Sequence, residues 1–458
     1  MNSSPKGVDL GEALANPTKA FFVRMLTRDI SIEDCILDLI DNSVDAAWET
    51  EGGGHPGLEA STRLSTFEIR LDIQPDSFSI EDNCGGLDLT TAKETAFNFG
   101  NTNMNAHTDS TLSVGVYGIG MKRAIFKLGA KAEIKSTYQE SQELESFSVT
   151  IDTDEWLDND SSTWGFPITS TTASSQTGLS IHVESLTSEV ASAFSTDSFI
   201  NTLRRTIARD YMLPLGHGLT IYVNGIEVEG APMTLMESAE FAPFHETFQD
   251  NGVTYTIIAG MAEPPSQDSE PDNQKNRKTE SGWNVFCNGR SVLNNDTTSA
   301  SGWGANGVPR WHPQYNGFKG YVFFTASNPA LLPMTTTKRH VDESSLIYKK
   351  ALGKMVGPAK TWVEYTNRRK ERQAEAKNKE SEATPAPISS LKKNKNLGVP
   401  KLGQKRVKMV NVSFLKPLSE VQQLGATFGD SGMKYREVGM KAFELAYGLR
   451  VDEKGHRD

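Results

Sequence analysis

Three short segments bring polar residues and glycines together in spacings that could support chemistry. The first, DLIDNSVDA, places Asp38 and Asn42 one helical turn apart, so a carboxylate and an amide share one helix face, while Asp41 and Asp45 share a neighbouring face. The Asn42 amide oxygen suits Mg²⁺, which takes few protein ligands, and the Asp38 carboxylate could accept a proton from an attacking water. A solvated face of an amphipathic helix would explain the same residues.

The second segment, EDNCGGL, ends an alternating run of residues that predicts a strand. The Asp82 carboxylate could accept a hydrogen bond from an exocyclic amine, while Gly85 and Gly86 would let the backbone approach a flat ring closely. An ordinary turn between two strands is the alternative.

The third segment, GVYGIGMKR, places Gly115, Gly118 and Gly120 directly before a predicted helix. Glycines in this position expose the free N–H groups of a helix N-terminus to a phosphate chain, and Lys122 or Arg123 would add positive charge. The segment fits neither the dinucleotide-binding fingerprint nor the P-loop, since GxxxxGK[ST] is absent.

In this fixed order the three segments resemble the N box and the two glycine boxes of the GHKL superfamily of ATPases, which includes gyrase-type topoisomerases, ninety-kilodalton heat-shock chaperones, histidine kinases, MutL and MORC proteins. The resemblance implies a Bergerat fold that binds ATP with Mg²⁺, with Asn42 as the metal ligand, Asp82 at the adenine amine and residues 96–115 as a lid. It also implies an adenine-site threonine, for which Thr177 is the match and Ser180 the rival. The other residues that it implies at the nucleotide are Asp45, Gly86, Gly115, Tyr117, Gly118, Ile119, Gly120, Met121 and Lys122.

Two positions depart from the superfamily pattern. Asp38 stands where hydrolysing members carry a catalytic glutamate and is one methylene shorter, and Cys84 replaces a glycine of the first glycine box. We therefore expect an ATPase with slow hydrolysis, with Asp38 as its catalytic base. The alternative is a non-hydrolysing nucleotide-dependent binding module or a chaperone-like switch for a partner protein.

A lysine far from the three boxes connects a second domain to this site. Lys338 lies in PMTTTKRHVD, and resemblance to MORC-like or MutL-like members implies that a transducer-like domain sends this lysine to the γ-phosphate as a second catalytic residue. A solvent-facing loop lysine is the ordinary alternative. The same resemblance implies an ATP-dependent homodimer that acts as a clamp, and by association alone it suggests DNA and prokaryotic genome (antiviral) defence.

Hydrophobic periodicity predicts the elements that position these residues. Apolar residues recur at helical spacing over 27–49, with Ser31 and Asp34 as a capping pair, while 67–73, 77–81, 145–151 and 179–183 alternate as strands. We predict an α+β class: a Bergerat-fold sandwich, with a mixed sheet and helices on one face, followed by an α/β transducer-like domain.

Four parts follow along the chain. They are an ATP-binding domain over 1–190, a transducer-like domain over 191–365, a basic linker over 366–408 that is disordered around Pro385–Pro387, and a small C-terminal segment over 409–458 with a helix at 434–448.

Composition limits the class of protein. There is no run of about 18 apolar residues and no signal-like N-terminus, so we expect a cytoplasmic protein without membrane contact. Cys35, Cys84 and Cys287 follow no disulfide or zinc-ligand spacing. The net charge is −11, yet residues 351–410 hold fifteen Lys or Arg against five Glu, so this stretch is either a DNA contact or a solvated charged segment. Residues 409–458 are a candidate for binding a protein partner.

Overall fold

The computed structural model describes residues 18–51, 63–98, 119–158, 164–265, 280–335, 337–403 and 410–452. The chain divides at Gly403 into two compact units. The larger unit contains two sheets with their helices, and the smaller unit contains helices.

A mixed eight-stranded sheet forms the first layer of the larger unit, in the strand order β5-β4-β3-β6-β2-β1-β7-β8. All neighbouring strands are antiparallel except β1 and β7, which are parallel. The strands are β1 (Glu68–Ile73), β2 (Ser77–Asp82), β3 (Gly129–Glu140), β4 (Glu143–Asp152), β5 (Ile168–Ser170), β6 (Gly178–Leu186), β7 (Thr220–Val223) and β8 (Ile226–Glu227).

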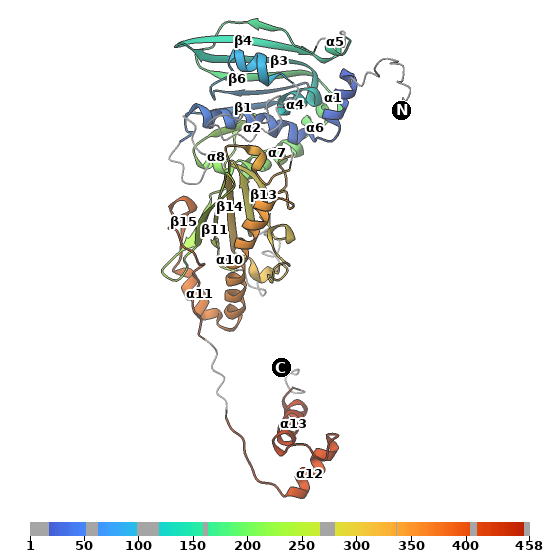
Figure 1. Cartoon of the computed structure of the whole chain (residues 1–458), viewed down its shortest axis with the longest axis vertical. Helices are drawn as coiled ribbons and strands as arrows, with labels where there is room; N and C mark the ends of the chain where they lie inside the picture. The colour runs from blue at the N-terminus through green and yellow to red at the C-terminus, as the bar shows by residue number, and fades with distance from the viewer. Residues whose placement is uncertain are drawn as a thin grey trace, which may run out of the picture. The chain divides into compact units, whose positions relative to one another are not determined.

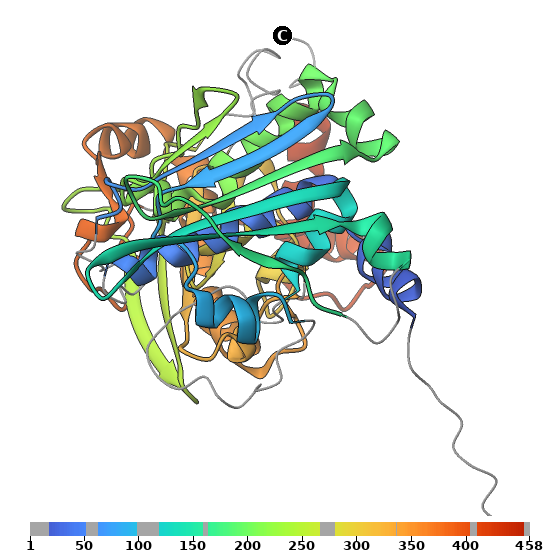
Figure 2. The same cartoon turned by 90° about the horizontal axis from the view of Figure 1, so that it is seen from above.

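Helices cover one face of this sheet, because only one face is apolar. Leu71, Ile80, Ile181 and Ile134 lie opposite one another in successive strands and are all buried, whereas their sequence neighbours alternate toward solvent. Figure 1 shows α1, α2, α4 and α6 on this face, and Figure 2 shows the strands from the other side, with α2 behind them. The helices are α1 (Lys19–Arg28), α2 (Ile32–Thr50), α3 (Leu89–Thr91), the π-helical turn η1 (Ala92–Ala96), α4 (Gly120–Leu128), α5 (Thr153–Asp158), α6 (Ser188–Phe194), α7 (Asp197–Asp210) and α8 (Met212–Gly216).

The helix α2 has a defined start. The Ser31 hydroxyl accepts a hydrogen bond from the Asp34 backbone N–H at 3.0 Å and donates to the Asp34 carboxylate at 2.8 Å, as the capping pair predicts. The helix therefore begins at Ile32 and not at residue 27, because the preceding residues form the end of α1.

A second sheet has five strands in the order β10-β11-β14-β12-β13, parallel only between β12 and β14. Every residue of β12 and β14 is buried, because the sheet is covered on both faces: by the long helix α10 on one, and by α8, β9 and η5 on the other. The elements are β9 (Thr234–Glu237), β10 (Phe244–Asp250), β11 (Val253–Met261), β12 (Gly282–Cys287), β13 (Arg290–Asp296), β14 (Phe318–Thr325), β15 (Thr384–Pro387), α10 (Leu346–Glu371), α11 (Gln373–Ser381), and the short turns η2 (Ser299–Ser301), η3 (Pro313–Tyr315), η4 (Pro329–Leu331) and η5 (Ile388–Ser390).

The predicted α+β class, with a mixed sheet covered by helices on one face and a second region of sheet and helices, is confirmed. The boundary predicted at residue 190 needs correction. β7 and β8 complete the first sheet, and its hydrophobic core continues to Val228. The sequence did not reveal this, since β7 pairs with β1 across a long stretch of chain.

The linker predicted over 366–408 also needs correction. The strand β15 pairs with β9 where disorder was expected around Pro385–Pro387, and Leu391, Leu397 and Leu402 are buried. Arg369 and Glu380 form a buried bidentate ion pair at 2.7 and 3.0 Å, so charged residues that suggested a solvated linker in fact join α10 to α11. Residues 366–403 therefore belong to the second region.

The smaller unit contains α12 (Leu418–Thr427), α13 (Tyr435–Tyr447) and the π-helical turn η6 (Gly448–Asp452). α13 agrees with the helix predicted at 434–448. None of the helices in the described parts of the chain is long and apolar enough to cross a membrane.

The ion pair between α10 and α11 provides a test of the corrected boundary. The substitution Glu380→Gln leaves the buried Arg369 charge without its carboxylate, so we expect the free energy of unfolding to fall by about 3–5 kcal/mol in urea titrations. The exposed Glu382→Gln, at the end of the same helix, is the matched control and should change it by less than about 0.5 kcal/mol. Equal, small effects of the two substitutions would mean that 366–403 is a linker after all.

Candidate functional site

The predicted boxes meet around α2. A Cβ atom built on Gly120, the first residue of α4, would lie 3.4 Å from the Asp38 carboxylate. The second glycine box therefore contacts α2 at Asp38. The Ser43 hydroxyl of α2 donates to the Asp82 carboxylate at the end of β2, at 2.6 Å. The structure thus places Gly120 beside Asp38 and Asp82 beside Ser43, both on α2. Gly115, Tyr117, Gly118 and most of the lid at 96–115 lie outside the described residues.

The Asp82 carboxylate is held by three donors. One oxygen accepts from the backbone N–H groups of Cys84 at 2.9 Å and Leu179 at 3.3 Å, and the other accepts from Ser43. Burial raises the pKa of Asp82, and the three hydrogen bonds oppose this only in part. A fixed carboxylate of this kind can accept one further hydrogen bond from an exocyclic amine.

The turn after Asp82 requires its two glycines. Gly85 and Gly86 have φ values of +114° and +76°, and a Cβ atom on Gly86 would lie 2.1 Å from the Thr137 carbonyl oxygen. Cys84, which replaces a glycine of the superfamily pattern, is fully buried, and its carbonyl oxygen accepts from the Thr50 hydroxyl at 2.8 Å. The Cys84 side chain is therefore accommodated in the core, and Asp82 keeps its hydrogen bonds.

The strand β6 separates the two candidates for the adenine-site hydroxyl. Gly178 packs against the Asp82 backbone, where a Cβ atom would come within 2.0 Å of the carbonyl oxygen, and Thr177 directly precedes it. Ser180 shares a face with His182, opposite to the helix-covered face of Ile181. The position favours Thr177 over Ser180.

The N-terminus of α4 contains Gly120, Met121 and Lys122, preceded by Ile119, and no side chain caps it. Lys122 is buried and donates to the carbonyl oxygens of Ala96 and Asn98, each at 2.6 Å, so in this structure it holds the start of the predicted lid segment. Burial lowers the pKa of Lys122 to about 8. Lys122 therefore contacts the lid segment, as the resemblance implies, and its contact with phosphate stays a prediction.

The predicted metal ligand Asn42 is exposed on α2 one turn after Asp38, and Asp45 is half-buried. Among the described residues, no group of three His, Cys, Asp or Glu side chains could hold a metal ion by itself. A single amide ligand fits Mg²⁺, which keeps most of its positions for water and phosphate oxygens.

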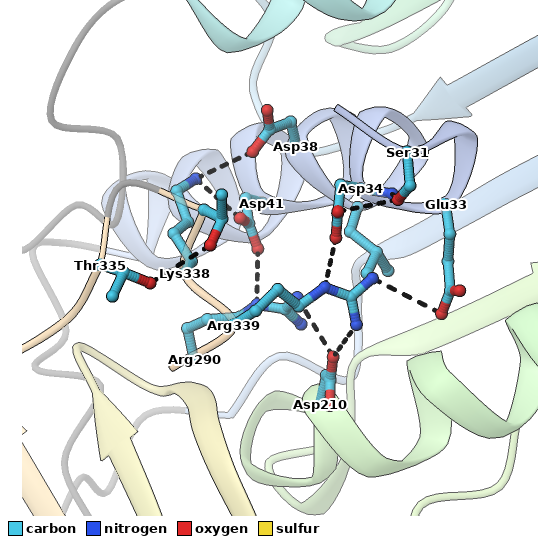
Figure 3. Close-up of polar contacts among 12 residues, drawn as sticks. Ser31, Glu33, Asp34, Asp38, Asp41, Asp210, Arg290, Thr335, Lys338 and Arg339 are labelled. Carbon is cyan, nitrogen blue, oxygen red and sulfur yellow. Dashed lines mark hydrogen bonds and ion pairs between the residues drawn. The ribbon is translucent and has the colours of Figure 1, made fainter. Parts of the chain in front are cut away.

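Lys338 reaches α2 from the second region, as Figure 3 shows. Its ammonium nitrogen lies 2.7 Å from Asp41 Oδ2 and 3.4 Å from Asp38 Oδ1, and the other oxygen of Asp38 pairs with Arg123 of α4. Burial opposes the charged form of Lys338, but the carboxylates of Asp41 and Asp38 outweigh this and raise its pKa. Lys338 has a φ of +56° in a turn closed by its N–H bond to the Thr335 carbonyl at 2.9 Å, a left-handed conformation that costs about 1–2 kcal/mol.

Three charged residues of this site were not found from the sequence. Arg290 lies between Asp41 and Asp210, and Arg339 pairs with Asp34, Glu33 and Asp210. Arg290 opens the strand β13 after an Asn-Gly turn, Asp210 ends α7, and Arg339 follows Lys338 in a loop. No motif contains them; only the neighbouring Lys338 could have drawn attention to Arg339.

Asp41, which the sequence placed on a neighbouring face without a role, is a deeply buried carboxylate of the site. It is 2% exposed and accepts a hydrogen bond from the Tyr211 hydroxyl at 2.7 Å in addition to its ion pairs. Burial alone would raise the pKa of Asp41, but the charges of Lys338 and Arg290 lower it.

Comparison with known protein families identifies the first domain. Residues 30–178 match the family described as histidine kinase-, DNA gyrase B-, and HSP90-like ATPase. The matched stretch includes α2, β2 and α4, so the chain carries a GHKL-type ATPase domain. No curated protein matches the chain. Kinship to MORC-like or MutL-like members in particular stays a prediction.

The turn at Gly85 and Gly86, which follows Asp82, can be tested by a substitution that adds one methyl group. Gly86→Ala adds a Cβ atom where the Thr137 carbonyl oxygen lies and forces alanine into a positive φ, so we expect a loss of at least about 2 kcal/mol in the free energy of unfolding. The control Gly165→Ala, whose Cβ would meet nothing within 4 Å, should be neutral. If urea titration gives equal values for the two variants, the turn described here is incorrect.

Proposed function

We propose that this protein is a slow, Mg²⁺-dependent ATPase that works as an ATP-gated switch, in which Lys338 leaves the carboxylates of α2 and binds the terminal phosphate. The observation that carries the proposal is that Lys338, from the second region, already lies against Asp38 and Asp41 at the edge of the ATPase domain. A terminal phosphate would compete with these carboxylates for one ammonium group. ATP would thereby alter the contact between the two regions of the larger unit.

The other residues would each bind a different part of the nucleotide. Asp82 would accept a hydrogen bond from the adenine amine, with Thr177 as the second group at the adenine, and the amides of Gly120 and Met121 would face the phosphate chain. Asn42 would be the protein ligand of Mg²⁺, which would neutralise phosphate charge. The segment 96–115, anchored through Lys122, would form the lid.

Slow hydrolysis is supported by the surroundings of Asp38. A general base must reach its water, and Asp38 is shorter than glutamate and is paired with both Arg123 and Lys338. Departure of Lys338 would free one of its oxygens. Arg123 would still hold the other, which leaves Asp38 a restrained base.

The substitution Asp38→Asn separates hydrolysis from mere binding. We expect the ATPase rate to fall by about 10²-fold, because the variant cannot accept the proton, while affinity for a non-hydrolysable ATP analogue changes little. Phosphate release and isothermal titration measure the two quantities. Equal, near-zero rates in variant and wild type would favour the alternative, a nucleotide-dependent binding module that does not hydrolyse ATP.

The substitution Lys338→Met tests the switch itself. Loss of a charged contact to the terminal phosphate should weaken binding of the ATP analogue by about tenfold or more, since such contacts contribute about 1.5–3 kcal/mol, and should leave ADP binding unchanged. The exposed Lys349→Met is the matched control. A uniform loss for both nucleotides, or no loss for either, would contradict the proposal.

The wider proposal is that of a dimerising clamp. Large apolar side chains exposed on the smaller unit, among them Phe443 and Tyr435 of α13, support a protein partner there, such as a second copy. Several basic residues of 351–410 are exposed, including Lys392, Lys393 and Lys395, which supports contact with DNA phosphates and, more remotely, a role in genome defence. Because 366–403 is folded, charge substitutions are suited to testing DNA contact, whereas deletion is not.

A further inference from the structure

The two carboxylates that Lys338 bridges each have a second cationic partner. Asp38 pairs with Arg123, and Asp41 pairs with Arg290, whose Nε lies 3.4 Å from Asp41 Oδ1. Figure 3 shows Lys338 and Arg290 approaching Asp41 from different directions. Lys338 is therefore the cation that can depart while both carboxylates stay paired.

Arg290 is held rigidly where it serves Asp41. It is 3% exposed, its Nη2 lies 3.3 Å from Asp210 Oδ2, and its guanidinium lies over the Tyr211 ring at 4.4 Å. The Tyr211 hydroxyl donates to the same Asp41 oxygen that faces Arg290, at 2.7 Å. Arg290 and Tyr211 thus bind one oxygen of Asp41, and Lys338 binds the other.

This division of the two oxygens decides how easily Lys338 can leave. A buried carboxylate that loses its last cation is strongly unfavourable, whereas one that keeps a charged partner and a hydroxyl donor is not. Asp210 does not depend on Arg290 in the same way, because it also pairs with Arg209 at 2.6 Å and Arg339 at 3.4 Å.

We propose that Arg290 is a positioning residue that keeps Asp41 paired when Lys338 moves to the terminal phosphate, and that it thereby sets the preference of the site for triphosphate over diphosphate. The inference rests on the proposed function, because it requires that Lys338 exchanges Asp41 for phosphate. It adds that the exchange is controlled by a residue of β13 that does not touch the nucleotide.

The test is isothermal titration of the full chain with Mg²⁺ and either adenylyl-imidodiphosphate or ADP. In Arg290→Met, Asp41 keeps Lys338 as its remaining cation, so we expect the affinity ratio of analogue to ADP to fall at least tenfold, with ADP affinity unchanged within twofold. The exposed Arg310→Met is the matched control and should keep the wild-type ratio.

A second substitution separates this role from a merely structural one. In Arg290→Met/Asp41→Asn the neutral side chain needs no cation, so the ratio should return to the wild-type value or above. Should Arg290→Met fail to fold, Asp41→Asn alone measures the same competition and should raise the ratio severalfold. An unchanged ratio in Arg290→Met, an equal loss for both nucleotides, or no gain from Asp41→Asn would overturn the inference.

The substitution Lys338→Met separates a failure of the proposed function from a failure of the role of Arg290. If that variant leaves the ratio unchanged, the proposed function itself fails. If it lowers the ratio and Arg290→Met does not, only the role of Arg290 is rejected.

Discussion

Buried carboxylates on α2 impose the constraint on which the rest of the structure depends. Asp38 and Asp41 lie within a helix that is covered by the sheet on one side and by the second region on the other, so their charges require partners. The partners come from three other elements: Arg123 from α4, Arg290 from β13 and Lys338 from a loop. The ATPase domain and the second region are therefore joined through ion pairs to the carboxylates of α2.

The helix α2 presents polar residues to two different parts of the structure. Its Asp38 lies beside Gly120 of the second glycine box, and its Asp41 and Asp34 pair with cations of the second region. In the proposed function, a phosphate bound beside Asp38 would act directly on Lys338, with no need for a long path through the core. Direct ion pairing is a short and physically defined route for coupling.

The sequence was sufficient where chemistry is local. The cap at Ser31, the helix that follows it, and Asp82 with its glycines all depend on short spacings, and the structure forms each of them. Lys338 was predicted from a family resemblance, and the structure places it against Asp38 and Asp41 of α2. The role of Arg290 could not be predicted from the sequence, because the turn before it resembles any hairpin turn and its partners are distant in sequence.

The two misplaced boundaries have a related cause. The parallel pairing of β7 with β1 joins distant segments, which local periodicity cannot detect. The pairing of Arg369 with Glu380 makes a folded segment look like a charged linker, since a buried ion pair and an exposed one have the same composition.

The most direct measurement is an experimental structure with Mg²⁺ and a non-hydrolysable ATP analogue bound. The account predicts that Lys338 Nζ, now 2.7 Å from Asp41 Oδ2, moves beyond hydrogen-bonding distance and contacts the terminal phosphate, while Arg290 and Tyr211 stay on Asp41. A bound analogue whose terminal phosphate has no contact with Lys338, with the Lys338–Asp41 pair intact, would contradict it.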